Sequence, residues 1–464
     1  MGNIKIRSLL LYLMSVAFLF GAGFFVYEYL SNAKTWSLTS INKHLSSGSA
    51  YCGQILDRND FILAKTLDGK RIYSENKNVR KALLHTVGDS ASSFQTSVQT
   101  RYSSDLFGYN LISGFGTPKP LDTTSDIKLT LDSKVCETAY KSLKDKKGTA
   151  LVYNYLTGEI ICMVSTPSYD PANKPDSKEI SENDKYEGVY INRALHASYT
   201  PGSVFKIITT AAALNNLEDA ETKTFKCSKT KIVDGEKIVC MHSHGNINLK
   251  NGMAKSCDIV FSDIAIELGK DTMTKEAEKL GFNKKFSIEG INLSTSKYEI
   301  VENSSKADLG WSGIGQYTVL LNPMHMLMIM SAIANRGVPV EPYFIDSVLS
   351  NKGFSSVSPR RHCPMERMLS ETNADKIKDM MRYTMTNHYG DKMFPNMKIC
   401  AKTGTAEVSE EKPPHGWMVG FSAEKNFPFA FVVIVENSDF GIKSAGPVAK
   451  NIMKSVYTNF YNKS

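Results

Sequence analysis

The sequence contains no internal repeat, no low-complexity segment and no long run of one charge. Its net charge of +8 is spread along the chain, and no basic run carries the interleaved aromatic side chains that nucleic-acid binding requires. We therefore expect no nucleic-acid partner. Because 42% of the 464 residues are apolar, disorder is excluded as well, and the chain is long enough for two or three folded domains.

Charged residues are also missing from residues 8–27, a segment rich in Leu, Phe and Val. About 20 such residues span a bilayer core of ~30 Å, so we expect a single membrane anchor there. Lys5 and Arg7 precede it, which predicts a cytoplasmic tail at residues 1–7 and an extracellular or periplasmic location for everything after the anchor. The following residues lack a small-x-small cleavage site, which favours an uncleaved anchor over a signal peptide.

A serine followed three positions later by a lysine stands at the head of an apolar run, in the segment Pro201-Gly202-Ser203-Val204-Phe205-Lys206. Positions i and i+3 share one face of a helix, so the Lys206 amine can reach the Ser203 hydroxyl. An unprotonated lysine there can take the serine proton and create a nucleophile. The same pattern occurs by chance as a helix cap followed by a surface lysine, so it needs support from elsewhere in the chain.

Two further motifs supply that support. The segment Lys402-Thr403-Gly404-Thr405 follows an apolar approach and predicts a strand that carries a cation, hydroxyl groups and a bare backbone edge. Between the two motifs, Ser256-Cys257-Asp258 opens an amphipathic helix. The order Ser-x-x-Lys, Ser-x-Asn, Lys-Thr-Gly is typical of acyl-serine penicillin-recognising enzymes, and only Asp258 departs from it. The chain resembles that family.

The resemblance extends over about residues 145–460 and is strongest to the monofunctional (class B) penicillin-binding proteins, in particular the small penicillin-binding protein A group. It also rests on Asn192-Arg193-Ala194, Gly313-Ile314-Gly315-Gln316 and Gly416-Trp417-Met418-Val419-Gly420-Phe421. It implies an α+β acyl-serine transferase fold over residues 146–464, an antiparallel sheet covered by helices on both sides. The sequence pattern predicts a hairpin over residues 150–165, a helix over 203–215, mainly helices over about 251–341, strands over 397–407, 417–422 and 427–435, and a last helix over 448–460. Strands thus come from both ends of the domain and helices from the middle, which agrees with this fold.

The family's activity is peptidoglycan D,D-transpeptidation, which cross-links stem peptides through an acyl-serine intermediate and is inhibited covalently by β-lactams. The resemblance makes Ser203 the nucleophile and Lys206 its general base. Ser256 would relay a proton between Lys206 and the leaving amine. Lys402 would be a second cation that lowers the pKa of Lys206. The resemblance requires no cofactor for this chemistry.

The substrate side of the site follows from the same resemblance. Thr403 and Thr405 would bind the terminal carboxylate of the substrate, and Gly404 would leave room for its backbone. The amides of Ser203 and Thr405 would form the oxyanion hole. Asparagine in the third place of the middle motif would donate to the substrate amide, whereas a carboxylate only accepts. Asp258 is therefore either protonated or serves a cation.

Two other functions stay open at this point. A serine β-lactamase or β-lactam sensor would have the same fold, but no recognisable motif supplies a carboxylate for fast deacylation. A catalytically weak scaffold of a wall-synthesis complex is supported only by the departure at Asp258. Both alternatives keep the fold and differ in the fate of the acyl-enzyme.

Residues 34–145 form a short region between the anchor and the transpeptidase domain. Gln54–Ala64 resembles a hairpin of class B N-terminal regions. The region is too short to hold a glycosyltransferase domain, so we expect chain polymerisation to belong to a partner, a polytopic membrane glycosyltransferase. A spacer role and a docking role for this region are equally compatible with the sequence.

The eight cysteines include a pair, Cys227 and Cys240, that flanks a predicted turn at Val233-Asp234-Gly235. Cys240, His242 and His244 alternate, so an extended chain would point all three to one face. With Cys227 on the other arm of a hairpin and Asp258 as a further ligand, these residues would form a structural zinc site near the active site. The alternative is a Cys227–Cys240 disulfide, which an extracellular compartment favours. The sequence leaves both open.

Overall fold

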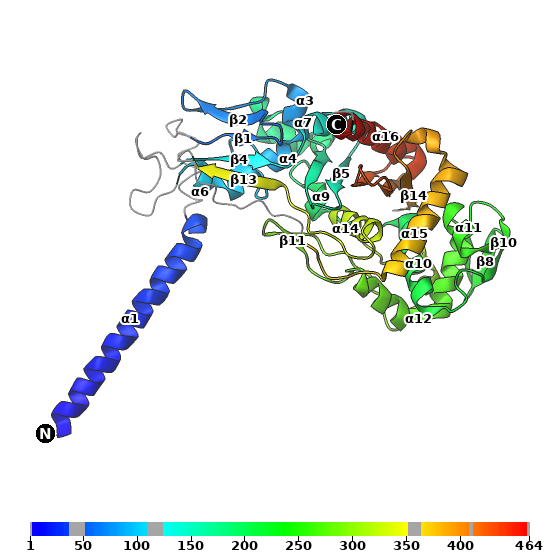
Figure 1. The fold of residues 1–464 in the computed structure, drawn as a ribbon, viewed down its shortest axis with the longest axis horizontal. Coiled ribbons are helices and arrows are strands. Elements are labelled where there is room, and N and C mark those ends of the chain that lie inside the picture. The colour runs from blue at the N-terminus through cyan, green and yellow to red at the C-terminus, as the bar shows by residue number, and fades with distance from the viewer. Residues whose placement is uncertain (1, 37–51, 109–123, 351–362, 408–411, 462–464) are drawn as a thin grey trace.

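The N-terminal apolar segment forms one long helix. The computed structural model describes residues 2–36, 52–108, 124–350, 363–407 and 412–461. Helix α1 runs over Gly2–Trp36 and projects away from the rest of the molecule (Figure 1). Its section Ile6–Ser31 is long and apolar enough to cross a membrane and is 0% buried. The helix is a candidate membrane span that contains the predicted anchor.

Five antiparallel strands form the central sheet, in the order β14-β15-β16-β5-β6. Two of them are the hairpin that the sequence predicted, β5 (Gly148–Asn154) and β6 (Ile160–Thr166). The other three lie near the end of the chain: β14 (Ile399–Ala406), β15 (His415–Ser422) and β16 (Phe429–Val435). Every residue of β6 and β16 is buried. This explains why these strands are continuous apolar runs and do not alternate between apolar and polar residues.

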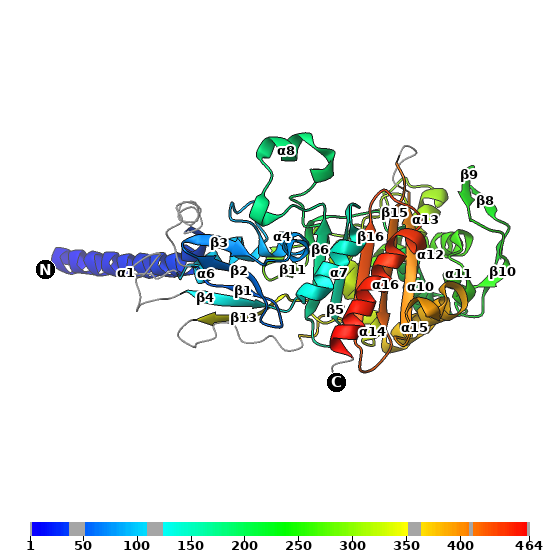
Figure 2. The same ribbon diagram turned by 90° about the horizontal axis from the view of Figure 1, so that it is seen from above.

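Helices cover both faces of this sheet. Helices α7 (Ser133–Leu143) and α16 (Gly441–Phe460) lie side by side on one face (Figure 2). Helices α14 (Pro323–Ala334) and α15 (Glu371–Thr384) pack against the other. Helix α14 is apolar on all sides and almost completely buried, as expected of a helix in the interior of a large domain. The α+β fold with an antiparallel sheet between helices is confirmed.

The helices from the middle of the sequence gather at the β14 end of the sheet (Figure 1). They are α10 (Lys206–Asn216), α11 (Leu249–Ala254), α12 (Asp258–Lys279) and α13 (Lys306–Gly313). The helix predicted at residues 203–215 begins as a short 3-10 turn, η3 (Gly202–Val204), and continues as α10. The turn η3 packs against β14, which brings two of the predicted motifs together.

A second five-stranded sheet stands between α1 and the central sheet, in the order β13-β4-β1-β2-β3. Its strands are β1 (Ile55–Leu56), β2 (Ile62–Leu67), β3 (Lys70–Tyr73), β4 (Ser125–Leu129) and β13 (Ile345–Ser350). The last of these comes from far outside residues 34–145 and pairs with β4. The predicted N-terminal region is therefore completed by a later segment of the chain. Parts of it, residues 37–51 and 109–123, lie outside the described residues.

A buried ion pair joins the two parts of the molecule. Arg80, in α3 (Lys77–Ala82), donates two hydrogen bonds to Asp170, at 2.7 and 2.6 Å. Burial alone would raise the pKa of Asp170, but the hydrogen bonds from Arg80 and from the Ala172 amide lower it below its usual value. The carboxylate therefore stays charged, and the ion pair holds the β6 side of the larger part to α3.

Shorter elements complete the described fold. They are α4 (Leu84–Val87), α5 (Val98–Arg101), α6 (Ser103–Leu106), η1 (Pro171–Asn173), α8 (Ser177–Glu182), η2 (Asp184–Tyr186), α9 (Arg193–His196), β7 (Thr224–Cys227), β8 (Thr230–Val233), β9 (Glu236–Val239), β10 (Gly245–Asn248), β11 (Ser287–Ile288), β12 (Ile291–Asn292), the π-helix η4 (Met385–Tyr389) and η5 (Asp391–Met393). The turn predicted at Val233-Asp234-Gly235 is confirmed as the β8–β9 hairpin.

Candidate active site

The predicted nucleophile lies at the start of α10. Ser203 belongs to η3, and Lys206 is the first residue of α10, one turn further along. The Lys206 Nζ lies 3.0 Å from the Ser203 Oγ. Lys206 is 0% exposed, whereas Ser203 is half-buried. A substrate can therefore reach the hydroxyl while the amine behind it is shielded from water.

Strand β14 approaches this turn closely because glycine occupies the contact positions. Gly202 has a φ of +54°, and a Cβ there would lie 2.3 Å from the carbonyl oxygen of Thr405. A Cβ on Gly404 would lie 2.8 Å from the carbonyl oxygen of Pro201. Since real Cβ atoms do not come so close to backbone, both positions require glycine. The approach places the backbone of Thr405 beside that of Ser203.

Ser256 connects the two lysines. Its Oγ lies 3.2 Å from the Nζ of Lys206 and 2.9 Å from the Nζ of Lys402, and its carbonyl oxygen accepts a 2.7 Å hydrogen bond from Lys206. Ser256 has a φ of +53°, a strained conformation for a serine. Such strain persists where the surrounding structure holds it, which is common at functional sites. Ser203, Lys206, Ser256 and Lys402 thus form one continuous chain of contacts.

Asp258 pairs with Lys206, the predicted general base. Its Oδ1 lies 2.7 Å from the Nζ of Lys206, in an ion pair whose side chains are 19% and 0% exposed. Of the two expectations for Asp258, a protonated acid and a partner of a cation, the geometry agrees with the second, and the cation is Lys206. The carboxylate also stands in the first turn of α12, where the helix dipole favours negative charge.

Lys402 is the group whose charge the site disfavours. It is 0% exposed and donates to the Ser256 hydroxyl and to the Thr403 carbonyl, at 2.9 Å in each case. Burial, together with the nearby charge of Lys206, lowers the pKa of Lys402 well below its usual value, and Asp258 offsets this only in part. A neutral Lys402 is able to accept a proton.

The hydroxyl groups of β14 lie at the open end of the site. Thr403 and Thr405 are half-buried. The Oγ1 of Thr405 accepts a 3.3 Å hydrogen bond from the amide of Gly441, at the start of α16. The Oγ1 of Thr403 lies 2.7 Å from the hydroxyl of Tyr389, a residue that the sequence did not single out. No pattern marks this tyrosine, and only the folding of η4 back onto β14 places it here.

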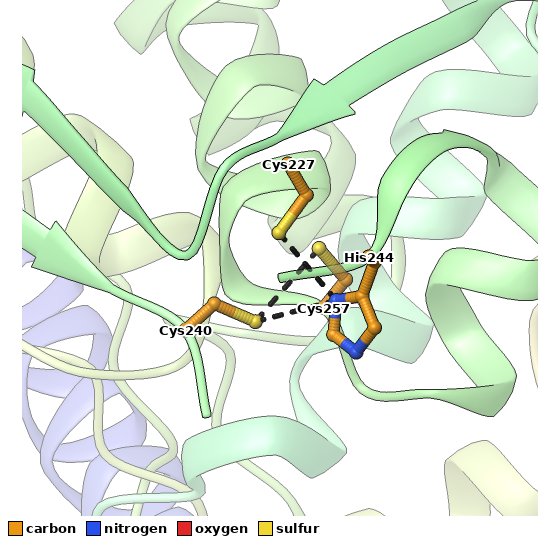
Figure 3. A group of neighbouring side chains, drawn as sticks. All are labelled: Cys227, Cys240, His244 and Cys257. Carbon is orange, nitrogen blue, oxygen red and sulfur yellow. Dashed lines mark hydrogen bonds between the residues drawn. The ribbon is translucent and has the colours of Figure 1, made fainter. Parts of the chain in front are cut away.

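Four side chains with metal-binding atoms gather beside the Ser256 loop (Figure 3). They are Cys227 at the end of β7, Cys240 after β9, His244 before β10 and Cys257 before α12. Their ligand atoms all lie within 4.8 Å of one another. The Nδ1 of His244 is 3.5 Å from the Sγ of Cys227 and 3.6 Å from that of Cys240, and the two sulfurs of Cys240 and Cys257 are 3.9 Å apart.

This group corrects the predicted ligand set. Cys227, Cys240 and His244 come together as expected, but the side chain of His242 is exposed, and Asp258 is turned to Lys206. Cys257 takes the fourth place. The side chains of Ser256 and Asp258 contact Lys206, whereas the side chain of Cys257 between them contacts Cys240 in the cluster.

The state of the thiols is also defined. All eight cysteines lie within the described residues, and each is a free thiol. A hydrogen bond from Cys257 lowers the pKa of Cys240 below its usual value, with a further contribution from the backbone amide of Asp258. The same contact raises the pKa of Cys257. Cys240 therefore lies in an environment that stabilises a thiolate.

Comparison with known proteins agrees with the family that the sequence motifs indicate. A family model described as the penicillin binding protein transpeptidase domain matches residues 148–454. Among curated proteins, the peptidoglycan D,D-transpeptidase PbpA of Mycolicibacterium smegmatis is 27% identical over 367 residues, which is 74% of this chain and 73% of that protein.

Solved structures with the same fold include a D,D-transpeptidase domain from Eggerthella lenta, with a TM-score of 0.78 and 25% identity, over 89% of this chain and 99% of that one. Penicillin-binding protein A of M. tuberculosis, solved as a ceftriaxone acyl-enzyme complex, has a TM-score of 0.77 and 23% identity, with the same coverage of both chains.

The close approach of β14 to the nucleophile generates a first prediction. Gly202→Ala adds a Cβ against the Thr405 carbonyl at a backbone angle that disfavours it, so the turn must shift. We expect a loss of about 100-fold in the rate of covalent labelling by a fluorescent penicillin, because a displacement of about 1 Å has that effect at a reacting centre. Gly235→Ala is the control, since it has a similar φ of +87° but nothing within 4 Å. Equal labelling of both variants would contradict the assignment.

Proposed function

The chain belongs to the penicillin-binding protein transpeptidase family, and we propose that it is a peptidoglycan D,D-transpeptidase that works through an acyl-enzyme on Ser203. One observation carries the residue assignment: the unbroken contact chain from the Ser203 hydroxyl through Lys206 and Ser256 to Lys402. Relatives named as D,D-transpeptidases and the β-lactam acyl-enzyme complexes of structural neighbours support the same activity. The acyl-serine chemistry requires no cofactor.

The contact chain defines a path for the proton. As the Ser203 Oγ attacks the substrate carbonyl, its proton passes to Lys206, the general base. Because Lys206 is held as a cation in its ion pair with Asp258, it first gives one of its protons to the Ser256 Oγ, which leaves the free amine that takes the Ser203 proton. Ser256 in turn gives its hydroxyl proton to neutral Lys402. The site then returns a proton to the leaving D-alanine amine along the same groups.

The substrate lies along β14. The amides of Ser203 and Thr405, whose backbones approach each other at Gly202, form the oxyanion hole. Thr403 and Thr405 donate their hydroxyl protons to the terminal carboxylate, with Lys402 nearby. Because Gly404 has no side chain, the turn that carries the nucleophile can pack directly against the strand at this position. A second stem-peptide amine then attacks the ester and completes the cross-link.

The second prediction tests the nucleophile. Ser203→Ala removes the attacking oxygen, so covalent labelling by fluorescent penicillin should fall below detection, while Ser455→Ala, on the far face of the sheet in α16, should label like the parent. The lifetime of the parent acyl-enzyme identifies the reaction class. Persistence for minutes to hours supports a transpeptidase, turnover within seconds supports a β-lactamase, and a parent that does not label supports a scaffold. Labelling of Ser203→Ala at the parental rate would remove Ser203 from the mechanism.

We also propose a membrane setting and a partner. Helix α1 anchors the chain with Lys5 and Arg7 on the cytoplasmic side, and the rest of the chain is extracellular or periplasmic. Residues 34–145, as a spacer or docking region, then lie next to the membrane beside a polytopic glycosyltransferase.

The third prediction concerns that complex. Tagged full-length protein should co-purify from mild detergent with a polytopic glycosyltransferase, because the anchor and residues 34–145 lie where such an enzyme works. The matched variant has residues 2–36 exchanged for an unrelated single-span anchor and should retain less of the partner. Undiminished co-purification after both the anchor and residues 34–145 are removed would contradict this arrangement.

The cluster beside the Ser256 loop supports a zinc site, which we propose for Cys227, Cys240, His244 and Cys257. Zn–S bonds of about 2.3 Å and a Zn–N bond of about 2.0 Å at tetrahedral angles place sulfur and nitrogen about 3.5 Å apart and two sulfurs about 3.8 Å apart. The distances of 3.5, 3.6 and 3.9 Å agree with that geometry. Three thiolates and one imidazole are a common structural zinc set. A bound ion would fix the loop that carries Ser256 and Asp258.

The fourth prediction tests the metal. Protein purified without added metal should contain about one equivalent of zinc, and Cys257→Ser should lose most of it, because a tetrahedral site loses a ligand. Cys363→Ser, at an exposed cysteine, is the control. Asp258→Asn should keep its zinc, which separates this ligand set from one that includes Asp258. Less than about a tenth of an equivalent in the parent, together with no free thiol at residues 227 and 240, would establish the disulfide.

A further inference from the structure

The loop before β14 is built to hold one tyrosine against the site. Helix α15 ends in the π-helix η4, whose last residue is Tyr389, and π-helical turns are rare and frequent at functional sites. Gly390 follows with a φ of +92°, which turns the chain back. Arg382 donates to both carboxylate oxygens of Asp391 across the loop and to the carbonyl of Ile399 in β14, the latter at 2.8 Å. The base of the loop is therefore fixed to the strand.

Tyr389 contacts a single residue of the strand in two ways. Its hydroxyl oxygen accepts a 3.2 Å hydrogen bond from the backbone N–H of Thr403 and lies 2.7 Å from the Thr403 Oγ1. Burial raises the pKa of Tyr389, so the phenol keeps its proton at neutral pH. Because the phenol oxygen already accepts from the amide, its own proton is available for the Thr403 Oγ1. The Thr403 hydroxyl proton is then free to point to a substrate.

The position of this contact on the sheet matters. Among the described strands, β14 stands at the end of the order, so no strand pairs with its outer edge. The N–H of Thr403 points to that edge, and residue 405, two positions along, presents its own N–H to the same side. Tyr389 occupies the edge at Thr403. A chain that pairs with β14 beside Thr405 therefore meets the phenol two residues further on.

We propose that Tyr389 is a positioning residue that makes the site specific for an acyl donor ending in a free carboxylate. It closes the edge of β14 to a continuing chain and orients the Thr403 hydroxyl as a donor to the terminal carboxylate. The inference rests on the proposed transpeptidase function, since it concerns the substrate of that reaction. A tyrosine that only packs the loop would contribute to stability and would not distinguish a free carboxylate from a blocked one.

Tyr389→Phe removes one oxygen and keeps the ring. The variant is compared with the parent using penicillin G and its methyl ester, with the saturation constant and the maximal acylation rate determined separately. We expect the second-order acylation constant for the free acid to fall about tenfold, mainly through the saturation constant, because one hydrogen bond to a charged group is lost. The constant for the ester should change less than about twofold. Tyr383→Phe is the matched control, since its hydroxyl contacts Asn251 outside the site.

A double-mutant cycle with Thr403→Val identifies the route. If Tyr389 acts through Thr403, then Tyr389→Phe has no further effect in the Thr403→Val background. Asp391→Asn, which loosens the loop without touching the tyrosine, should shift the acid-to-ester ratio in the same direction. A parental ratio in Tyr389→Phe, or equal losses for acid and ester, would overturn the inference. Ser203→Ala that still labels would instead overturn the proposed function, so the two failures are distinguishable.

Discussion

Two buried lysines and one carboxylate set the constraint around which the site is built. Lys206 and Lys402 are each 0% exposed and meet at the Ser256 hydroxyl, while Asp258 contacts only the first of them directly. A buried pair of like charges is costly, and one counter-ion compensates one of them. Asp258 pairs with Lys206, and burial together with the nearby Lys206 lowers the pKa of Lys402. In the proposed mechanism, that difference gives proton movement a direction away from Ser203 and leaves a place for a carboxylate at residue 258.

The rest of the fold keeps these groups in place. Lys402 is carried by a strand inside a rigid antiparallel sheet, and Lys206 by a helix whose first turn fits against that strand only because residues 202 and 404 are glycine. Of these three residues, Ser256 has the least regular backbone conformation, with a φ of +53°. Its loop is held on both sides, by the hydrogen bond from Lys206 to its carbonyl and by the Cys257 contact to Cys240. The cysteine and histidine cluster thus contacts the loop that carries Ser256, the proposed proton relay.

The sequence was sufficient to predict structural elements and candidate site residues wherever these depend on local spacing. The Ser203–Lys206 pair, the β5–β6 hairpin and the three C-terminal strands were predicted from patterns within one element. The sequence was insufficient to predict contacts between segments that lie far apart along the chain. Strand β13 joins the N-terminal sheet from more than 200 residues away, in a pairing that no local pattern encodes. Cys257 was missed as a member of the cluster for a different reason: it lies between two residues that the sequence assigned to the active site, and only the folded loop shows that its side chain contacts Cys240.

Tyr389 is another residue that the sequence could not identify, because its proposed role depends on its position at the edge of strand β14. An unpaired strand edge invites pairing with any extended chain, and proteins usually cover such edges. An enzyme that reads an extended peptide must leave part of one open. Among the described strands, β14 is the edge strand, and the Thr403 amide on it is covered by a phenol that accepts its hydrogen bond. The phenol oxygen accepts from the Thr403 amide, which an apolar side chain would leave unsatisfied. In the proposed arrangement, the same residue both ends the substrate strand and orients the hydroxyl that receives its terminus.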